Sequence, residues 1–108
     1  KYWGEKCAIT GCELVKTSKA SHIKPWCSSN NIERLDVYNG LLLIPNLDSA
    51  FDYGYISFDN EGKIIISSSL KENDKIKLGI NSELRIRKIE EDHIKYLEYH
   101  RQNIFKNK

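Results

Sequence analysis

The sequence lacks several features that would assign it to a large class of proteins. No apolar run approaches the ~20 residues of a membrane-spanning helix, so we expect no membrane partner. Lys and Arg number 17 against 15 Asp and Glu, which leaves a formal net charge of only +2. Proteins that coat nucleic acids are far more basic, so the charge permits DNA binding without indicating it.

Cysteine is scarce, and the chain has no Cys-x-x-Cys pair. Cys7, Cys12 and Cys27 are an odd number of thiols, and no secretory feature is evident, which favours reduced cysteines in a cytoplasmic protein. A structural zinc site is the alternative, because Cys27 and His22 follow the other two cysteines closely in the sequence. This alternative predicts a zinc-stabilised interaction domain, but its fourth ligand would be a histidine that the chemistry described below also requires.

Methionine is absent, including from the first position. The 108 residues are the length of one ordinary domain, and 40% of them are hydrophobic, so we expect residues 1–108 to form a single domain. We also expect this domain to be the C-terminal part of a longer protein. The chain shows no internal repeat and no low-complexity linker.

Hydrophobic spacing and turn residues predict a compact α+β domain. The strongest local signal is the turn pair Asn39-Gly40, which is followed at once by the apolar run from Leu41 to Ile44. This run is too short for a helix and too apolar for an exposed strand. We therefore expect a buried strand that pairs with an extended segment carrying His22.

Further elements follow from similar signals. Pro45 fits the first turn of a helix that continues to about Tyr53 and stops at Gly54. The last segment, 91–105, has apolar residues at helical spacing, with acids at its start and lysines at its end. The remaining expected elements are extended segments at 6–10, 20–23 and 84–89, a hairpin of 55–59 with 63–67, a helical turn at 32–35 and a short helix at 71–78.

Candidate catalytic residues stand in order along these elements. His22 ends a predicted strand, Asn39 lies at the turn, and Asp48 and Asp52 lie four residues apart on the predicted helix. Both carboxylates therefore project from one helix face, and Asp52 lies at the negative end of the helix, so a divalent cation such as Mg²⁺ is a natural partner. A neutral histidine opposite the metal can take a proton from attacking water. Together these groups suggest metal-assisted hydrolysis of a phosphodiester bond.

Each of these residues also has an ordinary structural interpretation. A lone histidine is more often structural or merely exposed. Asn39 before Gly40 is a usual turn residue, and Asp52 can simply end a helix. Spacing alone therefore leaves the nuclease interpretation in the minority.

Several phrases of the sequence follow one another in a distinctive order. They are Cys7-Ala8-Ile9-Thr10-Gly11, Ala20-Ser21-His22-Ile23-Lys24-Pro25-Trp26, Glu33-Arg34-Leu35-Asp36, Asn39-Gly40-Leu41-Leu42-Leu43, Leu47-Asp48-Ser49-Ala50-Phe51-Asp52-Tyr53-Gly54, Ile56-Ser57-Phe58 and Tyr96-Leu97-Glu98-Tyr99-His100-Arg101. Together they cover nearly the whole chain and closely resemble the HNH endonuclease family, in the branch found at the C-termini of restriction-type enzymes.

The resemblance implies a ββα-metal nuclease core with an additional β-hairpin and a C-terminal helix. It identifies His22 as the general base and Asn39 as the residue that holds the hairpin loop and helps to orient the base. Asp48 takes the position of the signature metal ligand, and Asp52 that of a further ligand. Ser21 replaces the acid or histidine that many relatives have before the base, and its hydroxyl is a weak metal ligand.

The implied function is a Mg²⁺-dependent DNA endonuclease that accepts Mn²⁺ or another divalent cation as a substitute. Its expected partners are double-stranded DNA, a second copy in a homodimer, and an N-terminal DNA-recognition domain of the full-length protein. The candidate DNA-contacting residues are Lys24, Trp26, Arg34 and Arg101. His100 is expected to support packing or to touch a phosphate, and His93 to be exposed. The alternative, which Ser21 favours, is a nucleic-acid-binding module that has lost catalysis.

Overall fold

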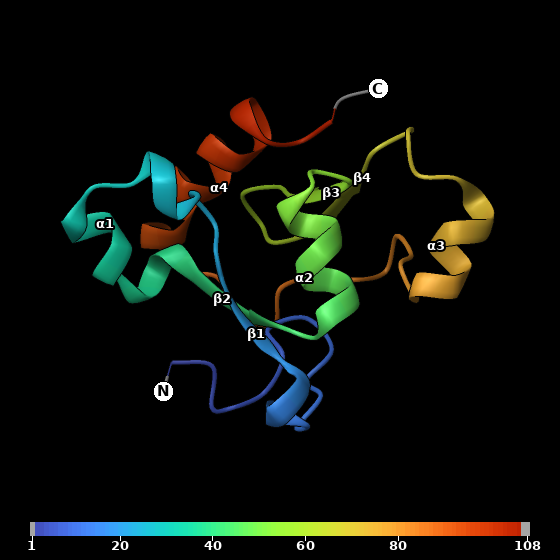
Figure 1. Ribbon diagram of the computed structural model, residues 1–108, viewed down its shortest axis with the longest axis horizontal. Coiled ribbons are helices and arrows are strands. Elements are labelled where there is room, and N and C mark those ends of the chain that lie inside the picture. Colours follow the sequence, from blue (N-terminus) through green and yellow to red (C-terminus); the bar gives the residue numbers. More distant parts are fainter. Residues whose placement is uncertain (1, 107–108) are drawn as a thin grey trace.

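The computed structural model describes residues 2–106 and has two small antiparallel sheets with helices around them (Figure 1). The strands are β1 (Lys19–His22), β2 (Gly40–Leu43), β3 (Ile56–Phe58) and β4 (Ile64–Ile66). The α-helices are α1 (Asn31–Leu35), α2 (Pro45–Asp52), α3 (Glu72–Leu78) and α4 (Glu91–Asn103). Short 3-10 helices lie at η1 (Val15–Thr17), η2 (Trp26–Ser28) and η3 (Val37–Asn39). The predicted α+β class is confirmed, with β1, β2 and α2 followed by a second hairpin and a C-terminal helix.

Strands β1 and β2 form an antiparallel hairpin with a long connection. Their register places His22 opposite Gly40 and Ser21 opposite Leu41. Leu41 and Leu43 are buried, as expected for the apolar run after the turn. The connection contains η2, α1 and η3, and it brings the chain back to β2 beside His22. The predicted pairing of these two strands is therefore confirmed.

Helix α2 follows β2 directly and crosses the centre of the molecule in Figure 1. It begins at Pro45, where the missing amide hydrogen costs nothing because the first turn has no acceptor for it. The helix packs against β1 and β3. Its buried residues are Leu47, Ala50 and Phe51. The polar face of α2 carries Asp48 and Asp52 and lies beside β1, where Ser21 contacts Asp52.

Gly54 ends this helical segment in the left-handed conformation, with φ of 79°. A Cβ atom at this position would lie 2.1 Å from the carbonyl oxygen of Ile104, so only glycine fits. The Gly54 carbonyl also accepts a hydrogen bond from the amide of Lys106 at 2.8 Å. This contact fastens the segment after α4 to the end of α2.

Helix α4 packs against β3 and η3. Its buried residues are His93, Tyr96, Leu97 and His100. The expectation that His93 is exposed is wrong, because its side chain is 0% exposed. Its Nδ1 atom accepts a hydrogen bond from the Glu90 amide at 2.8 Å. Its ring packs against the rings of Tyr2, Trp3 and Tyr38.

Two segments that were expected to be extended do not form strands. Residues 6–10 form turns, in which the Cys7 Sγ atom accepts hydrogen bonds from the amides of Ile9 and Thr10. Residues 84–89 contribute one isolated bridge, because consecutive amides there bind different segments: Ile86 binds the Gly62 carbonyl and Arg87 the Ala8 carbonyl. No helix within residues 2–106 has the length and apolar character needed to cross a membrane.

Candidate active site

A cleft of about 470 Å³ lies between β1, the start of the long connection, α2 and the end of α4. It brings together His22 from the end of β1 and both acids of α2. The residues that line it are Lys19, Ala20, Ser21, His22, Ile23, Pro25, Trp26, Asp48, Asp52, His100 and Ile104. Four of the sequence-predicted catalytic and metal residues therefore share one cleft, and the fifth, Asn39, is buried and does not line it.

The ring of His22 is held in one orientation by two neighbours. Its Nε2 atom lies 3.1 Å from the carbonyl oxygen of Arg34 in α1. A carbonyl can only accept, so Nε2 carries the proton in the neutral ring and Nδ1 carries the lone pair. The indole of Trp26 packs edge-to-face against the ring, with centroids 5.4 Å apart. The neutral imidazole therefore offers Nδ1 as its proton acceptor.

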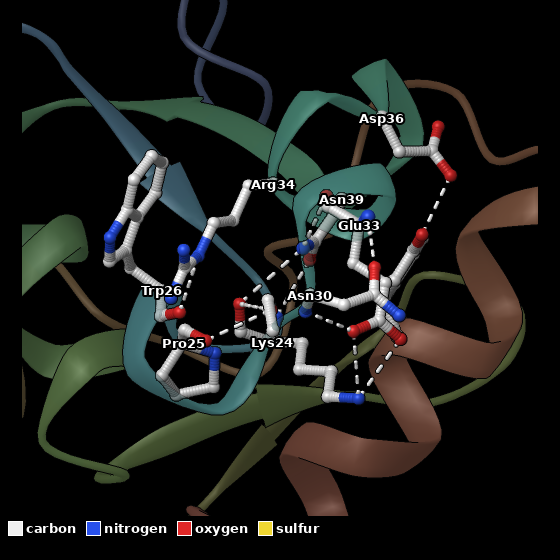
Figure 2. Close-up of polar contacts among 10 residues, drawn as sticks. Lys24, Pro25, Trp26, Asn30, Glu33, Arg34, Asp36 and Asn39 are labelled. Carbon is white, nitrogen blue, oxygen red and sulfur yellow. Dashed lines mark hydrogen bonds and ion pairs between the residues drawn. The ribbon is translucent and has the colours of Figure 1, made fainter.

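Asn39 holds the loop that follows His22 through the contacts drawn in Figure 2, and its side chain is fully buried. Its Oδ1 atom accepts a hydrogen bond from the Lys24 amide at 2.7 Å. Its Nδ2 atom donates to the carbonyls of Glu33 at 3.1 Å and Lys24 at 3.4 Å. The backbone carbonyl of Asn39 accepts from the Ile23 amide at 3.1 Å. Asn39 thus joins the end of β1, α1 and the start of β2.

Helix α1 is fixed by polar contacts that centre on Glu33. Asn30 caps the helix by accepting from the Glu33 amide at 2.8 Å, and the Glu33 carboxylate accepts from the Asn30 amide at 2.9 Å. The same carboxylate pairs with the Lys24 ammonium at 2.9 Å (Figure 2). The hydrogen bond from the Asn30 amide, followed by that from the Lys24 ammonium, holds the pKa of the Glu33 carboxyl below its ordinary value.

The two acids of α2 carry negative charge that the protein leaves unbalanced. No Lys or Arg among residues 2–106 forms an ion pair with Asp48 or Asp52. Burial, and then the negative charge of Asp48, raise the pKa of Asp52 above its ordinary value. The hydroxyl of Ser21 donates to Asp52 Oδ1 at 3.4 Å, which opposes this shift only in part.

The donor groups of this cleft suit a hard divalent cation. Mg²⁺ is commonly bound by one or two carboxylates, with waters and substrate phosphates completing its shell. Asp48 and Asp52 offer two such carboxylates in the lining of the cleft, and burial followed by the charge of Asp48 raises the pKa of Asp52. Elsewhere in residues 2–106, as here, no group of three or more His, Cys, Asp or Glu side chains is arranged to hold a metal ion. The zinc alternative therefore gains no support from the cysteines, of which Cys7 is buried and Cys27 exposed.

The candidate DNA-contacting residues fall into two groups. Trp26 is 56% exposed at the cleft, and the Arg34 guanidinium lies 4.5 Å from its ring centroid while Nε donates to the Trp26 carbonyl. Lys24 has its ammonium in the ion pair with Glu33. The guanidinium of Arg101 is bound to the Phe58 carbonyl at 2.8 Å and to the Asn60 side chain at 2.7 Å. Trp26 and Arg34 are thus beside the cleft, whereas the other two side chains serve contacts within the domain.

His100 forms part of the cleft wall and is bound on both sides. Its Nε2 atom donates to the Phe51 carbonyl at 2.8 Å, so its Nδ1 atom accepts from the Ser57 hydroxyl at 2.7 Å. The ring is stacked on Phe51 with centroids 3.8 Å apart. Burial lowers the pKa of His100 to about 4. With both nitrogens occupied, His100 fits the packing role that the sequence suggested.

The sequence interpretation did not anticipate the role of Glu33 in ordering this region. A readable signal was present, since Asn30 and Glu33 have the spacing of a helix-capping box. The contact of Tyr96 with Asp36, at 2.7 Å between the hydroxyl and Oδ2, was also unforeseen. It connects α4 to the residue that follows α1, across a separation in sequence that no local pattern covers.

Comparisons with known proteins show a family match and a likeness of fold. Residues 7–59 match the family model described as HNH endonuclease. None of the curated proteins matches the sequence significantly. Among solved structures, the modification-dependent TagI restriction endonuclease matches with a TM-score of 0.58 and 21% sequence identity, over 95% of this chain and 34% of that one. The chain thus spans about a third of that protein, and the likeness concerns the fold. The match of residues 7–59 to this family model and the shared α+β fold thus support the assignment of this chain to the HNH endonuclease family.

Proposed function

We propose that this domain is a divalent-metal-dependent DNA endonuclease and forms the cleavage domain of a restriction-type enzyme. The observation that carries the proposal is the shared cleft, in which His22 stands with Asp48 and Asp52. The match to a nuclease family model and the fold shared with a restriction endonuclease support the same conclusion.

His22 acts as the general base. With Nε2 donating to the Arg34 carbonyl, Nδ1 takes a proton from the water that attacks the phosphorus atom. The resulting imidazolium keeps its Nε2–H bond to the carbonyl, which stabilises the positive charge. Asn39 contributes indirectly, because it holds the loop between the base and α1.

Asp48 and Asp52 hold the cation, and Ser21 keeps the Asp52 carboxylate oriented through its hydroxyl. Mg²⁺, or Mn²⁺ in its place, supplies stabilisation of negative charge on the phosphate and on the leaving oxygen. Because the protein contributes few ligands, we expect weak metal binding in the absence of DNA.

The substrate is double-stranded DNA, which Trp26 and Arg34 contact beside the cleft. The Arg34 guanidinium is ordered by the Trp26 ring before substrate arrives, so little entropy is lost when it binds a phosphate. Phosphate contacts position the DNA without reading its sequence. Sequence or modification recognition is therefore assigned to an additional N-terminal domain, and cleavage of both strands to a homodimer with two such clefts.

A binding module that has lost catalysis is the competing function, because Ser21 occupies the position before the base. The two are separated by measuring plasmid cleavage with Mg²⁺ or Mn²⁺, with and without a chelator, for the wild type and His22→Ala. We expect the substitution to lower the cleavage rate ~10²–10⁴-fold, the usual contribution of a general base. Affinity for DNA, measured by fluorescence anisotropy, should be unchanged.

A chemical-rescue control distinguishes lost chemistry from lost structure. Added imidazole should restore part of the activity of His22→Ala, because it can occupy the cavity left by the missing side chain and take the proton from there. Near wild-type cleavage by His22→Ala would remove the general-base assignment. A wild-type protein that binds DNA but cuts with neither cation would favour the binding module.

A further inference from the structure

A partly buried ion pair connects the segment that follows His22 with the segment that carries the hydrogen-bond acceptor of His22. The Lys24 ammonium lies 2.9 Å and 3.1 Å from the two carboxylate oxygens of Glu33, and the side chains are only 20% and 22% exposed. Lys24 follows His22 by two residues, and Glu33 directly precedes Arg34, whose carbonyl accepts from His22. The pair therefore spans the connection on which the ring orientation depends.

Helix α1 has no hydrophobic anchor that would otherwise fix its position. It is five residues long and none of them is buried. Ile32 and Leu35, its apolar residues, are 81% and 83% exposed. So short a helix is not stable by itself, and its placement must come from its polar contacts. They include the Glu33 contacts with Lys24 and Asn30, the hydrogen bond from Asn39 to the Glu33 carbonyl, and the hydrogen bond from Arg34 Nε to the Trp26 carbonyl.

We propose that Lys24 and Glu33 are a positioning pair, which places the Arg34 carbonyl so that His22 is held as its Nε2–H tautomer with Nδ1 free to take a proton. This inference rests on the proposed function, in which His22 is the general base. It also changes the assignment of Lys24, whose ammonium binds Glu33 within the protein and does not bind a DNA phosphate.

The tautomer of His22 provides a test that needs neither metal nor DNA. We would label the protein with ¹⁵N and record the imidazole nitrogen shifts of His22 at a pH where the ring is neutral. The wild type should show one dominant tautomer, with the proton on Nε2. Lys24→Met and Glu33→Gln should each give a mixture of the two tautomers, because the Arg34 carbonyl is no longer held in place.

Cleavage kinetics give the functional half of the test. Lys24→Met and Glu33→Gln should each lower kcat by ~10- to ~100-fold, the range expected for a small misplacement of a reacting group. DNA affinity should change less than twofold, since neither side chain contacts the substrate. The double variant should be no worse than either single variant, because both remove the same contact.

Matched controls separate this role from general stability. Lys75 and Glu72 form a Lys–Glu ion pair at the same distance of 2.9 Å, within α3 and with Glu72 more exposed, so Glu72→Gln removes an ion pair that does not line the cleft. It should leave the tautomer and kcat unchanged. Lys24→Arg retains the charge and should retain the single tautomer. Lys24→Met leaves the Asn30–Glu33 capping box intact, so it serves as the test even if Glu33→Gln does not fold.

Two results would overturn the inference. One is a single Nε2–H tautomer in folded Lys24→Met, and the other is a loss confined to DNA affinity, which would return Lys24 to the phosphate contacts. A wild-type protein that fails to cut DNA would refute the proposed function, whereas the tautomer measurement would still decide whether the pair positions the ring.

Discussion

The side chain of Asn39 binds both backbone groups of Lys24: Oδ1 accepts from the amide at 2.7 Å, and Nδ2 donates to the carbonyl at 3.4 Å. The same side-chain amide donates to the Glu33 carbonyl at 3.1 Å. One buried side chain thus replaces the ladder hydrogen bonds that the chain loses where β1 ends. The asparagine of the turn serves the loop after His22 as much as the turn itself.

We predict that Asn39→Ala destabilises the domain by about 1–3 kcal/mol, because the Lys24 amide and Glu33 carbonyl lose a buried partner. Urea denaturation followed by circular dichroism measures this change. Asn73→Ala, on the surface of α3, is the matched control and should stay within ~0.5 kcal/mol of the wild type. Equal stabilities for the two variants would mean that water replaces Asn39 at little cost.

Much of the hairpin and of α2 could be predicted because its signals are local. Asn39-Gly40, the apolar run that follows, Pro45 and Gly54 each restrict the backbone of their own neighbourhood. The structure has the strands and the helix where these residues indicate. Element boundaries of this kind need no knowledge of the rest of the chain.

Features that depend on distant contacts were not predictable in this way. His93 is buried because Tyr2, Trp3 and Tyr38 surround it, and these residues are far from it in sequence. The segment 84–89 fails to form a strand because its amides bind two different partners. Nothing in the local pattern of either segment carries this information.

The candidate site likewise has a part that local spacing predicts and a part that depends on distant contacts. The spacing of Asp48 and Asp52 on one helix turn was enough to place both carboxylates together, and they share the cleft with His22. By contrast, the orientation of the His22 ring depends on the Arg34 carbonyl, and Lys24 forms its ion pair with Glu33. Both partners are distant in sequence from the residues that they bind. A lysine two residues after a base is interpreted from the sequence as a phosphate contact, whereas the fold places the Glu33 carboxylate against it.

The buried state of His100 predicts loss of stability in weak acid. Burial, together with the positive charge of Arg101, lowers the pKa of His100 to about 4, whereas the hydrogen bond with Phe51 opposes the shift. The unfolded chain, with a histidine pKa near ~6.5, binds the proton first, so stability falls as the pH drops from about 6.5 toward 4. His93, whose pKa burial also lowers, acts in the same direction.

For His100 alone the loss is at most about 3 kcal/mol over that range. The free energy of unfolding measured between pH 7 and pH 5, where most carboxylates remain ionised, should decline. The decline should be smaller in His100→Gln, which has no group that titrates there. A free energy that is flat over this range would show that the ring takes up its proton within the folded domain.

Gly54 allows a test of how tightly the end of α4 is fastened to α2. Gly54→Ala combines the strain of a positive φ with a Cβ atom 2.1 Å from the Ile104 oxygen. Gly79 has a similar φ of 73° with nothing within 4 Å, so Gly79→Ala measures the strain alone, about 1–2 kcal/mol. We expect Gly54→Ala to cost a further ~1–3 kcal/mol, as overpacking usually does. Equal melting temperatures would mean that the C-terminal segment moves away freely.

The two acids of α2 should contribute unequally. Asp48→Ala should eliminate metal-dependent cleavage, because Asp48 lies within the helix and is the residue that we propose as the main metal ligand. Asp52→Ala should cost less activity, because Asp52 is the last residue of α2 and part of its charge is engaged by Ser21. Without metal, Asp52→Ala should be more stable than the wild type by ~0.3–1 kcal/mol, since the lost charge opposed the helix dipole.

A Mg²⁺ or Mn²⁺ titration of plasmid cleavage for both variants, with thermal melts in chelator, measures these effects together. Asp74→Ala, an exposed acid on α3 that does not line the cleft, is the control and should cut like the wild type. The apparent affinity for Mn²⁺, measured by calorimetry, should fall further in Asp48→Ala than in Asp52→Ala, because the loss of the main ligand weakens metal binding more than the loss of a secondary ligand. If Asp48→Ala cuts normally and Asp52→Ala is inactive, the primary ligand is Asp52, and Ser21 acts by orienting that ligand for the metal.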